Sequence, residues 1–276
     1  MQYLERIPAP PLRRFVRSLW YANGPSAQYA RERILPSGCA QIVVTLSRSF
    51  LTDCPETGPE RQMPPGILVG QRSACEIIAT ADLVDLAGVL FAPGALPALI
   101  ADRADQLTNR NVPLDQIQSG FTDNLRTRML DGSSPEQRLR ILEDCLAPLL
   151  LTSRAERAFT PHPAVEFALQ QFAAASTRLS IAEVARRTGW SERRFSQLFR
   201  EQVGFPPKVW FRLQRFQRAV RQLRAGRQVA WVELAIECGF YDQAHLANEF
   251  RSFSGLDLTT YTAMRHELWA NHVRTG

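Results

Sequence analysis

Two stretches of this sequence repeat one pattern, in which polar side chains stand in front of an apolar scaffold. The first, TGWSERRFSQLFREQVG, covers residues 188–204, and the second, CGFYDQAHLANEFRSFSG, covers residues 238–255. Their first glycines, Gly189 and Gly239, stand fifty positions apart. Arginine, glutamine and asparagine, which occupy polar positions of these stretches, form paired hydrogen bonds with the edges of guanine and adenine. The repeat therefore predicts two units that share a scaffold and read different base pairs.

Each stretch predicts a helix that apolar residues hold down on one face. These anchors are Phe195, Leu198 and Phe199 in the first copy, and Leu246, Phe250 and Phe253 in the second. The side chains that then point outward are Arg193, Arg194, Ser196, Gln197 and Arg200, followed by Gln243, His245, Asn248 and Arg251. The arginines are equally suited to grip phosphates. His245 is open to a second interpretation, as a capped surface histidine.

Short helices with defined ends must position these side chains. Ser180 stands three residues before Glu183, which is the spacing of a capping box, and a short helix follows that ends at Gly189. Ser191 is suited to cap the next helix. A short helix, a tight glycine turn and a second helix with a polar front form a helix-turn-helix unit, in which the first helix braces the second.

The segment between the two copies predicts one long helix, FPPKVWFRLQRFQRAVRQLRAG. It runs from Pro206 to Ala225, with prolines at its start and Gly226 just after its end. Its apolar stripe consists of Trp210, Leu213, Phe216, Val220 and Leu223. About twenty residues at about 1.5 Å each give about 30 Å, close to the ~34 Å turn of B-DNA. Two reading units on this helix would meet successive major grooves on one face of the DNA.

The first hundred residues predict strands separated by turns, over residues 40–46, 66–70, 75–80 and 83–93. Helical spacing follows over residues 94–105, 121–132 and 134–151. The apolar pattern lapses around TSRAERAFTPHP, where we expect the domain boundary. The expected fold class is α+β. We expect a β-rich sensing or dimerisation domain with accessory helices over residues 1–155, and an all-α domain with two helix-turn-helix units and a long linker helix over residues 160–268.

Charge is distributed unequally between these two parts. From Arg154 onward there are eighteen basic and eleven acidic residues, a net charge of +7, which leaves −1 for the first 153 residues. This asymmetry is typical of a nucleic-acid-binding segment joined to a neutral one. The five cysteines contain no C-x-x-C pair, which argues against a disulfide scaffold and fits a reducing compartment. The sequence lacks the pattern of a signal peptide and a sufficiently long apolar run, so we expect a cytoplasmic protein with no membrane partner.

The C-terminal region resembles the double helix-turn-helix DNA-binding domain of AraC-type transcription regulators. The resemblance covers roughly residues 163–265 and rests on both copies, the connecting helix and the signature GFYDQAHLANEFRSFSG. It adds Ala244 to the base-contacting positions and implies RNA polymerase as a partner. The family signature often ends in G-x-x-P, whereas Leu258 stands here in place of the proline. ILPSGCAQIVV, GILVGQRS and LAGVLFAPGALPALI resemble, less specifically, a β-rich sensory region of such regulators.

Two other classes of protein are alternatives to a regulator, and the sequence argues against both. A β-barrel enzyme joined to a DNA-binding tail would need several metal-binding histidines, and His162, His245, His266 and His272 all follow residue 150. An alkyl-acceptor DNA-repair domain would need clustered cysteines, but Cys39, Cys54 and Cys75 are widely spaced. Cys39 is expected to pack at the start of a strand, and Trp190, Trp210 and Trp231 to lie in the core.

The sequence therefore predicts a sequence-specific DNA-binding transcription regulator that is not an enzyme and has neither a cofactor nor a metal. Its expected partners are double-stranded DNA, a small-molecule effector and a second copy of the chain. The helical segment over residues 95–150 is expected to support association, with packing on its own sheet as the alternative.

Overall fold

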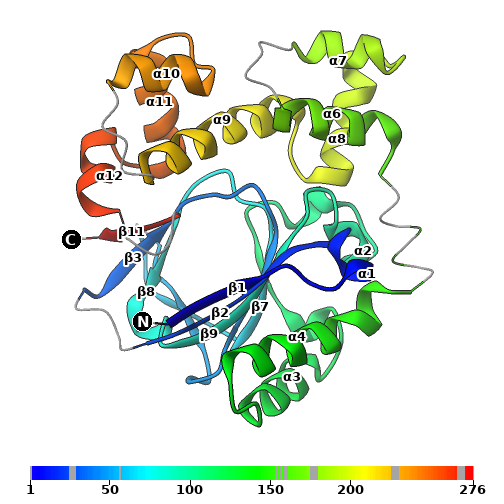
Figure 1. The fold of residues 1–276 in the computed structure, drawn as a ribbon, viewed down its shortest axis with the longest axis vertical. Coiled ribbons are helices and arrows are strands. Elements are labelled where there is room, and N and C mark those ends of the chain that lie inside the picture. Colours follow the sequence, from blue (N-terminus) through cyan, green and yellow to red (C-terminus); the bar gives the residue numbers. More distant parts are fainter. Residues whose placement is uncertain are drawn as a thin grey trace.

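The computed structural model describes residues 2–24, 29–55, 57–152, 155, 157, 161–174, 180–224, 230–265 and 271–275. Within these ranges the chain forms a β-rich N-terminal region and a helical C-terminal region, which lies above the sheets in Figure 1. The predicted α+β fold class is confirmed.

Two antiparallel sheets make up the β-rich region. The six-stranded sheet has the order β1 (Gln2–Arg6), β2 (Val16–Asn23), β9 (Asp85–Phe91), β4 (Gln41–Thr45), β7 (Gly66–Val69) and β10 (Asn111–Pro113). The five-stranded sheet has the order β11 (His272–Thr275), β3 (Arg31–Ile34), β8 (Glu76–Ala79), β5 (Leu51–Asp53) and β6 (Arg61–Met63). The predicted strands correspond to β4, β7, β8 and β9.

The six-stranded sheet carries its own helical cover. Helices α3 (Phe121–Leu130) and α4 (Pro135–Leu150) lie at the lower side of the sheet in Figure 1, and Leu125, Leu139 and Leu142 are buried in the same core cluster as Ile42 and Val89. Arg126 Nε donates to the carbonyl of Thr45 at 2.9 Å. These helices therefore pack on the chain's own sheet; their predicted role in association stays a prediction.

The sequence predicted one helix over residues 94–105, and this is wrong in detail. The structure has two pieces, α2 (Leu96–Ile100) and the 3-10 helix η2 (Ala104–Leu107). Ala101 has a left-handed backbone with φ 53°, which ends α2. The chain then turns and places Ala104 in the core with no exposed surface. The burial of Ala104 depends on tertiary packing, so the helical periodicity of the sequence does not predict it.

Seven helices follow in the described part of the C-terminal region. They are α6 (Pro163–Ala174), α7 (Ile181–Arg187), α8 (Glu192–Val203), α9 (Pro207–Arg224), α10 (Trp231–Cys238), α11 (Gln243–Ser254) and α12 (Leu258–Met264). The predicted caps are confirmed, because Ser180 Oγ accepts from the amide of Glu183 and Ser191 Oγ from that of Arg194. Helix α12 begins at Leu258 without the proline of the family pattern, because Asp257 caps the amide of Thr260 at 2.8 Å.

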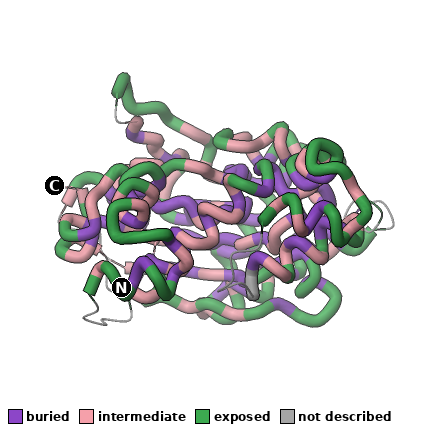
Figure 2. The backbone as a smooth tube through the Cα atoms, turned by 90° about the horizontal axis from the view of Figure 1, so that it is seen from above, coloured by how far each residue is buried: buried purple, intermediate pink, exposed green. Residues whose placement is uncertain are grey.

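Helix α9 is the spine of the C-terminal region. Its predicted apolar stripe, from Trp210 to Leu223, is buried, and the anchors Phe195, Phe199, Leu246, Phe250 and Phe253 are buried in the same cluster. Phe216 packs against Phe250 and Phe253, with ring centroids 5.1 and 5.2 Å away. Seen from above, buried stretches run through the middle of the molecule and exposed stretches surround them (Figure 2). Ala225 and Gly226 lie outside the described residues.

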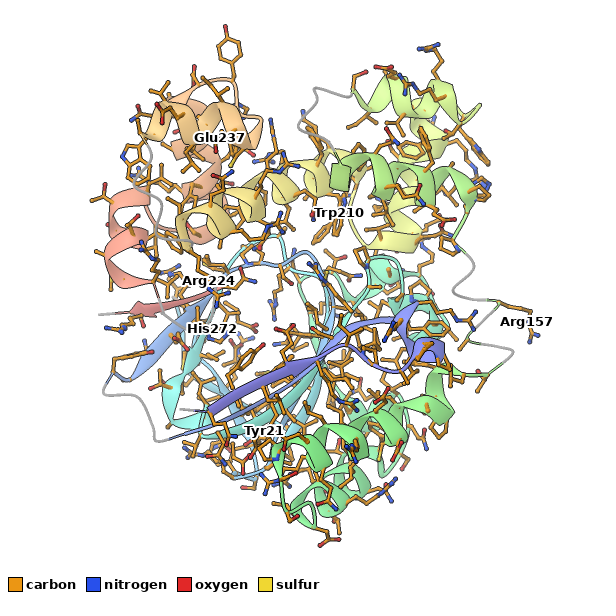
Figure 3. The ribbon with its side chains drawn as sticks, viewed as in Figure 1. Tyr21, Arg157, Trp210, Arg224, Glu237 and His272 are labelled. Atoms are coloured by element: carbon orange, nitrogen blue, oxygen red, sulfur yellow. The ribbon has the colours of Figure 1, made fainter. Side chains whose placement is uncertain are left out.

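The C-terminal region is packed directly on the sheets. Gln217 Nε2, on α9, donates to the carbonyl of Pro36 at 2.7 Å. Next to this bond, Gly38 lies against the side chains of Trp210 and Leu213. Trp210 lies between α9 and the sheets in Figure 3. The loop after β3 therefore supports the linker helix.

A methyl group at Gly38 would test this packing. Gly38 has φ +79°, and a Cβ there would stand 2.9 Å from Leu213 Cδ2 and Trp210 Cζ3. Gly58→Ala is the matched control, because Gly58 has φ +102° with no atom near the new Cβ. Both variants should lose about 1–2 kcal/mol through backbone strain, and Gly38→Ala should lose about 1–3 kcal/mol more through overpacking. Urea unfolding measures both losses; equal losses would contradict the packing.

Candidate functional site

The first recognition helix, α8, presents its predicted side chains at the surface. Arg193, Arg194, Gln197 and Arg200 are exposed, and Ser196 is half-buried. The amide of Gln197 is held within the helix, since it accepts from Arg194 Nη1 at 3.3 Å and donates to Glu201 at 2.9 Å. Contact with a base edge would exchange these intrahelical bonds for bonds to DNA.

The second recognition helix, α11, has the same orientation in its own unit. Gln243, Ala244, Asn248 and Arg251 are exposed. His245 is half-buried, and its role as a base reader stays a prediction. Its Nδ1 accepts from the amide of Tyr241 at 3.3 Å and its ring meets Phe240 edge-on, which ties it to the turn.

Both recognition helices contact the N-terminal region through their C-terminal ends. At the end of α8, Thr108 Oγ1 donates to the carbonyl of Gly204 at 2.7 Å. At the end of α11, the amide of Cys75 donates to the carbonyl of Phe253 at 3.1 Å, and Arg33 Nη1 donates to that of Ser254 at 3.2 Å. The amino-terminal halves, which carry most of the predicted readers, therefore point away from the sheets.

Segment 70–76, between β7 and β8, touches both of these ends. The Gln71 side chain fills the space beside Gly204, which has φ +94° and ends α8. Arg33 Nη1, 2.9 Å from Cys75 Sγ, fills the space beside Gly255, which ends α11. One connection of the N-terminal region thus helps to position both recognition helices.

The two helix-turn-helix units differ in charge. Residues 180–204 carry five arginines and three glutamates, a net charge of +2, whereas residues 230–255 carry one arginine and four carboxylates, a net charge of −3. In the first unit, Arg186 and Arg187 on α7 are exposed beside the turn and were not predicted as contacts. In the second unit, the equivalent positions are Ile236, which is 67% exposed, and Glu237.

Tyr241 is a further surface residue that the sequence reasoning missed. Its side chain is 77% exposed, and it directly precedes Asp242, the cap of α11. The first copy has no counterpart, because there the cap Ser191 follows the aromatic residue Trp190 directly. This one-residue insertion was the available sequence signal.

One predicted contact, Arg200, is engaged by the N-terminal region. Its Nε lies 3.1 Å from Asp105 Oδ2, on η2, and Arg103 of the same segment lies 3.7 Å from Glu201. Arg200 also stands at the C-terminal end of α8, whereas base-reading residues usually lie near the start of a recognition helix. A phosphate contact by Arg200 would compete with Asp105.

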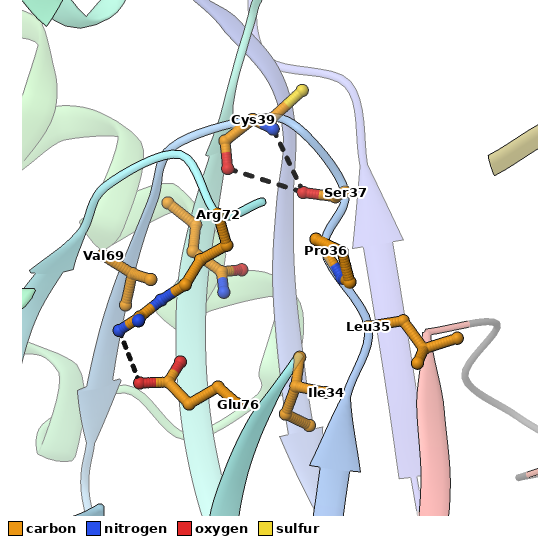
Figure 4. Close-up of a pocket in the computed structure, with 9 residues that line it drawn as sticks. Ile34, Leu35, Pro36, Ser37, Cys39, Val69, Arg72 and Glu76 are labelled. Carbon is orange, nitrogen blue, oxygen red and sulfur yellow. Dashed lines mark hydrogen bonds and ion pairs between the residues drawn. The ribbon is translucent and has the colours of Figure 1, made fainter. Parts of the chain in front are cut away.

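A small cavity lies beneath the contact between α9 and the sheets (Figure 4). The space inside it that a water molecule can reach is about 20 Å³, enough for about one water. The loop after β3 forms one wall with Leu35, Pro36 and Cys39. The opposite wall carries Arg72 and Glu76, whose Nη2 and Oε1 atoms are 2.6 Å apart. Burial raises the pKa of the Glu76 carboxyl, while Arg72 and a hydrogen bond from Asn111 oppose that rise.

Within the described residues there is no group of three or more histidine, cysteine and acidic side chains that is suited to hold a metal ion. Cys39 is buried just before β4, and burial raises the pKa of its thiol. Trp210 is buried, whereas Trp190 and Trp231 are partly buried against the same core. His266 lies outside the described residues.

In the part of the chain that is described, no helix combines the length and the apolar character needed to span a bilayer.

Two family models match the sequence. Residues 169–264 match a helix-turn-helix domain, and residues 4–113 match a domain of unknown function (DUF6597). No curated protein matches the sequence.

Solved structures are similar to parts or to most of the chain. The DNA-binding domain of AdpA in complex with a target DNA is 28% identical, with 37% of this chain and 90% of that chain covered and a TM-score of 0.34. ToxT from Vibrio cholerae is 9% identical, with 95% and 97% covered and a TM-score of 0.49. ToxT from strain SCE256 with a bound unsaturated fatty acid is 8% identical, with 94% of each chain covered and a TM-score of 0.48.

A β-rich region followed by two helix-turn-helix units with projecting recognition helices defines a DNA-binding transcription regulator. The C-terminal region of this chain is an AraC-type helix-turn-helix domain, and its N-terminal region is a domain whose function is unknown.

Removal of the Asp105 carboxylate should release Arg200 for a phosphate. Each additional phosphate contact steepens the dependence of log K on log salt concentration by about 0.9. We therefore expect Asp105→Asn to give a steeper slope than Asp102→Asn, which removes the same charge from a residue that does not pair with Arg200. Titration of a fluorescent duplex at several salt concentrations measures both slopes. Equal slopes would show that Arg200 does not reach the DNA.

Proposed function

We propose that the protein binds double-stranded DNA sequence-specifically through the amino-terminal halves of α8 and α11. The observation that carries this proposal is the orientation of the two helices. Each is held at its C-terminal glycine, Gly204 or Gly255, and each directs its exposed amide residue, Gln197 or Asn248, toward solvent. Glutamine and asparagine form paired hydrogen bonds with adenine in the major groove.

The linker helix supports simultaneous reading of two grooves. Helix α9 has 18 residues without a break, which corresponds to about 27 Å of helix. Its stripe is buried against the anchors of both units. This helix length is of the same order as the ~34 Å turn of B-DNA, so we expect the two units to meet successive major grooves.

The charge difference between the units assigns them unequal tasks. The first unit supplies Arg186, Arg187, Arg193 and Arg194 at its surface and thus most of the phosphate attraction. The second unit, with its net charge of −3, reads bases through Gln243, Asn248 and its other polar positions. Phosphates would repel its carboxylates, so it contributes less to affinity than to specificity.

We also propose that the N-terminal domain senses a small molecule, mediates dimerisation, or does both. The cavity between Pro36 and Arg72 is the candidate place for sensing, because its lining combines apolar walls with a guanidinium, a carboxyl and an amide. With water-accessible space of about 20 Å³, it must widen before it admits a metabolite. Its outer wall is the loop on which α9 rests. RNA polymerase, which the resemblance implies as a partner, remains a prediction.

Loss of one amide should weaken specific binding only. Gln197→Ala and Asn248→Ala should each cost about 1–3 kcal/mol on the preferred duplex and relax one base position. Arg186→Ala on α7, the control for a phosphate contact, should weaken binding to all sequences alike, because Arg186 is exposed and lies outside both recognition helices. The preferred duplex is first selected from random DNA, and each variant is then titrated on that duplex and on a scrambled one. Equal losses on both duplexes for the amide variants would contradict the orientation of α8 and α11.

The cavity is tested with the full chain and a panel of small polar metabolites. A ligand that binds the folded state raises the melting temperature. Gln41→Leu removes an amide from the cavity lining at similar size. We expect a metabolite that stabilises the wild type to lose its effect on this variant. An unchanged effect would place the ligand elsewhere.

A further inference from the structure

The end of the chain returns to the N-terminal region and completes one of its sheets. Strand β11 pairs antiparallel with β3, in a register that places His272 opposite Ile34 and Thr275 opposite Arg31. The amide of Leu35 extends the ladder and donates to the carbonyl of Asn271 at 2.7 Å. Strand β11 lies beyond the domain limit at residue 268 that the sequence suggested. It belongs to the C-terminal region by sequence and to the N-terminal sheet by pairing.

Side chains fasten this strand on both of its faces. His272 Nδ1 lies 2.9 Å from Oε2 of Glu32, a carboxylate with no exposed surface. Val273 is fully buried in the helical core of the C-terminal region. Figure 3 shows His272 at the seam between β11 and β3. The strand is therefore attached to one domain through its backbone and His272, and to the other through Val273.

The neighbours of β11 carry the other contacts that hold the second helix-turn-helix unit in place. Arg33, paired with Val273 in β3, is the residue that donates to the carbonyl of Ser254 at the end of α11. Gln217 of α9 donates to Asn271 Oδ1 at 3.0 Å as well as to Pro36. Loss of β11 would leave β3 as an exposed edge strand, and it would remove Val273 from beside Arg33 and Asn271 from Gln217.

We propose that residues 271–275 are a strap that holds the second helix-turn-helix unit on the N-terminal domain and releases it when β11 leaves β3. A strand of four residues forms few ladder bonds, and short strands gain stability mainly from their neighbours. The strap depends on its contacts with both domains. Because it is short, it is suited to detach as one local unit while the rest of the fold stays intact. Ile34 and Leu35, which it pairs with, also line the cavity, so a change in the cavity wall acts directly on its partner strand.

His272→Glu in the full chain tests the strap. A carboxylate at this position would face the buried Glu32 carboxylate, and like charges at this distance repel strongly when they are removed from water. His272→Gln is the matched control, because its amide can still donate to Glu32. A chain that ends at residue 270 is the second variant and removes the strap without adding a charge.

Hydrogen–deuterium exchange with mass spectrometry and small-angle X-ray scattering provide the readout. In both strap variants, we expect exchange over residues 31–35, at Cys75 and over residues 251–255 to rise by about tenfold or more, which is a local opening. Strands β4 and β9 and the middle of α9 should keep their protection, the radius of gyration should increase, and His272→Gln should behave like the wild type.

Two results would overturn the proposal. If exchange rises only over residues 31–35, while Cys75 and residues 251–255 stay protected, β11 merely covers an edge strand. If β4, β9 and α9 lose protection together with residues 31–35, the tail is part of the global fold and is not a strap.

Discussion

The rest of the structure depends on how the two recognition helices meet the N-terminal domain. A helix has two different ends, and here both C-terminal ends, at Gly204 and Gly255, are packed against the sheets. Segment 70–76 takes part in both contacts, through Gln71 and Cys75. The polar amino-terminal halves must then project away from the sheets. The same contacts that stabilise the arrangement of domains thus determine which halves of α8 and α11 are left exposed.

Helix α9 connects the two units physically and electrostatically. Its apolar stripe is shared by both cores, and arginines recur on it at every third position, from Arg212 to Arg224. Arg212 pairs with Glu249 of α11 at 2.8 Å, and Arg215 donates to the carbonyl of Gly239 at 3.0 Å. A cation is favourable at the C-terminal end of α10, where carbonyl groups without helical partners gather. These two arginines therefore stabilise the packing of the second unit on α9. Because they are engaged within the protein, the number of arginines on α9 is larger than the number of positive charges that are available for DNA.

The two helix-turn-helix units have the same fold and different surfaces. The anchors are apolar in both and are buried except for Leu198, which is partly buried, whereas the net charge changes from +2 to −3. Burial restricts the anchors because they pack in one shared core, but solvent imposes no such restriction on the outer positions. The packing of the core therefore does not impose the unequal charge. It agrees with a first unit that grips phosphates and a second unit that reads bases with little electrostatic help.

The sequence by itself determined the helices of the C-terminal region, their caps and their buried faces, because these follow from local spacing. Ser180, Ser191 and the stripe of α9 are examples in which a few adjacent residues specify the element. It also indicated the outward positions, of which most are exposed. Only the tertiary structure decided that Arg200 faces Asp105, that Ala101 interrupts a predicted helix, and that β11 joins β3. Each of these depends on residues far apart in the chain, and a short strand such as β11 has no periodicity long enough to identify its partner.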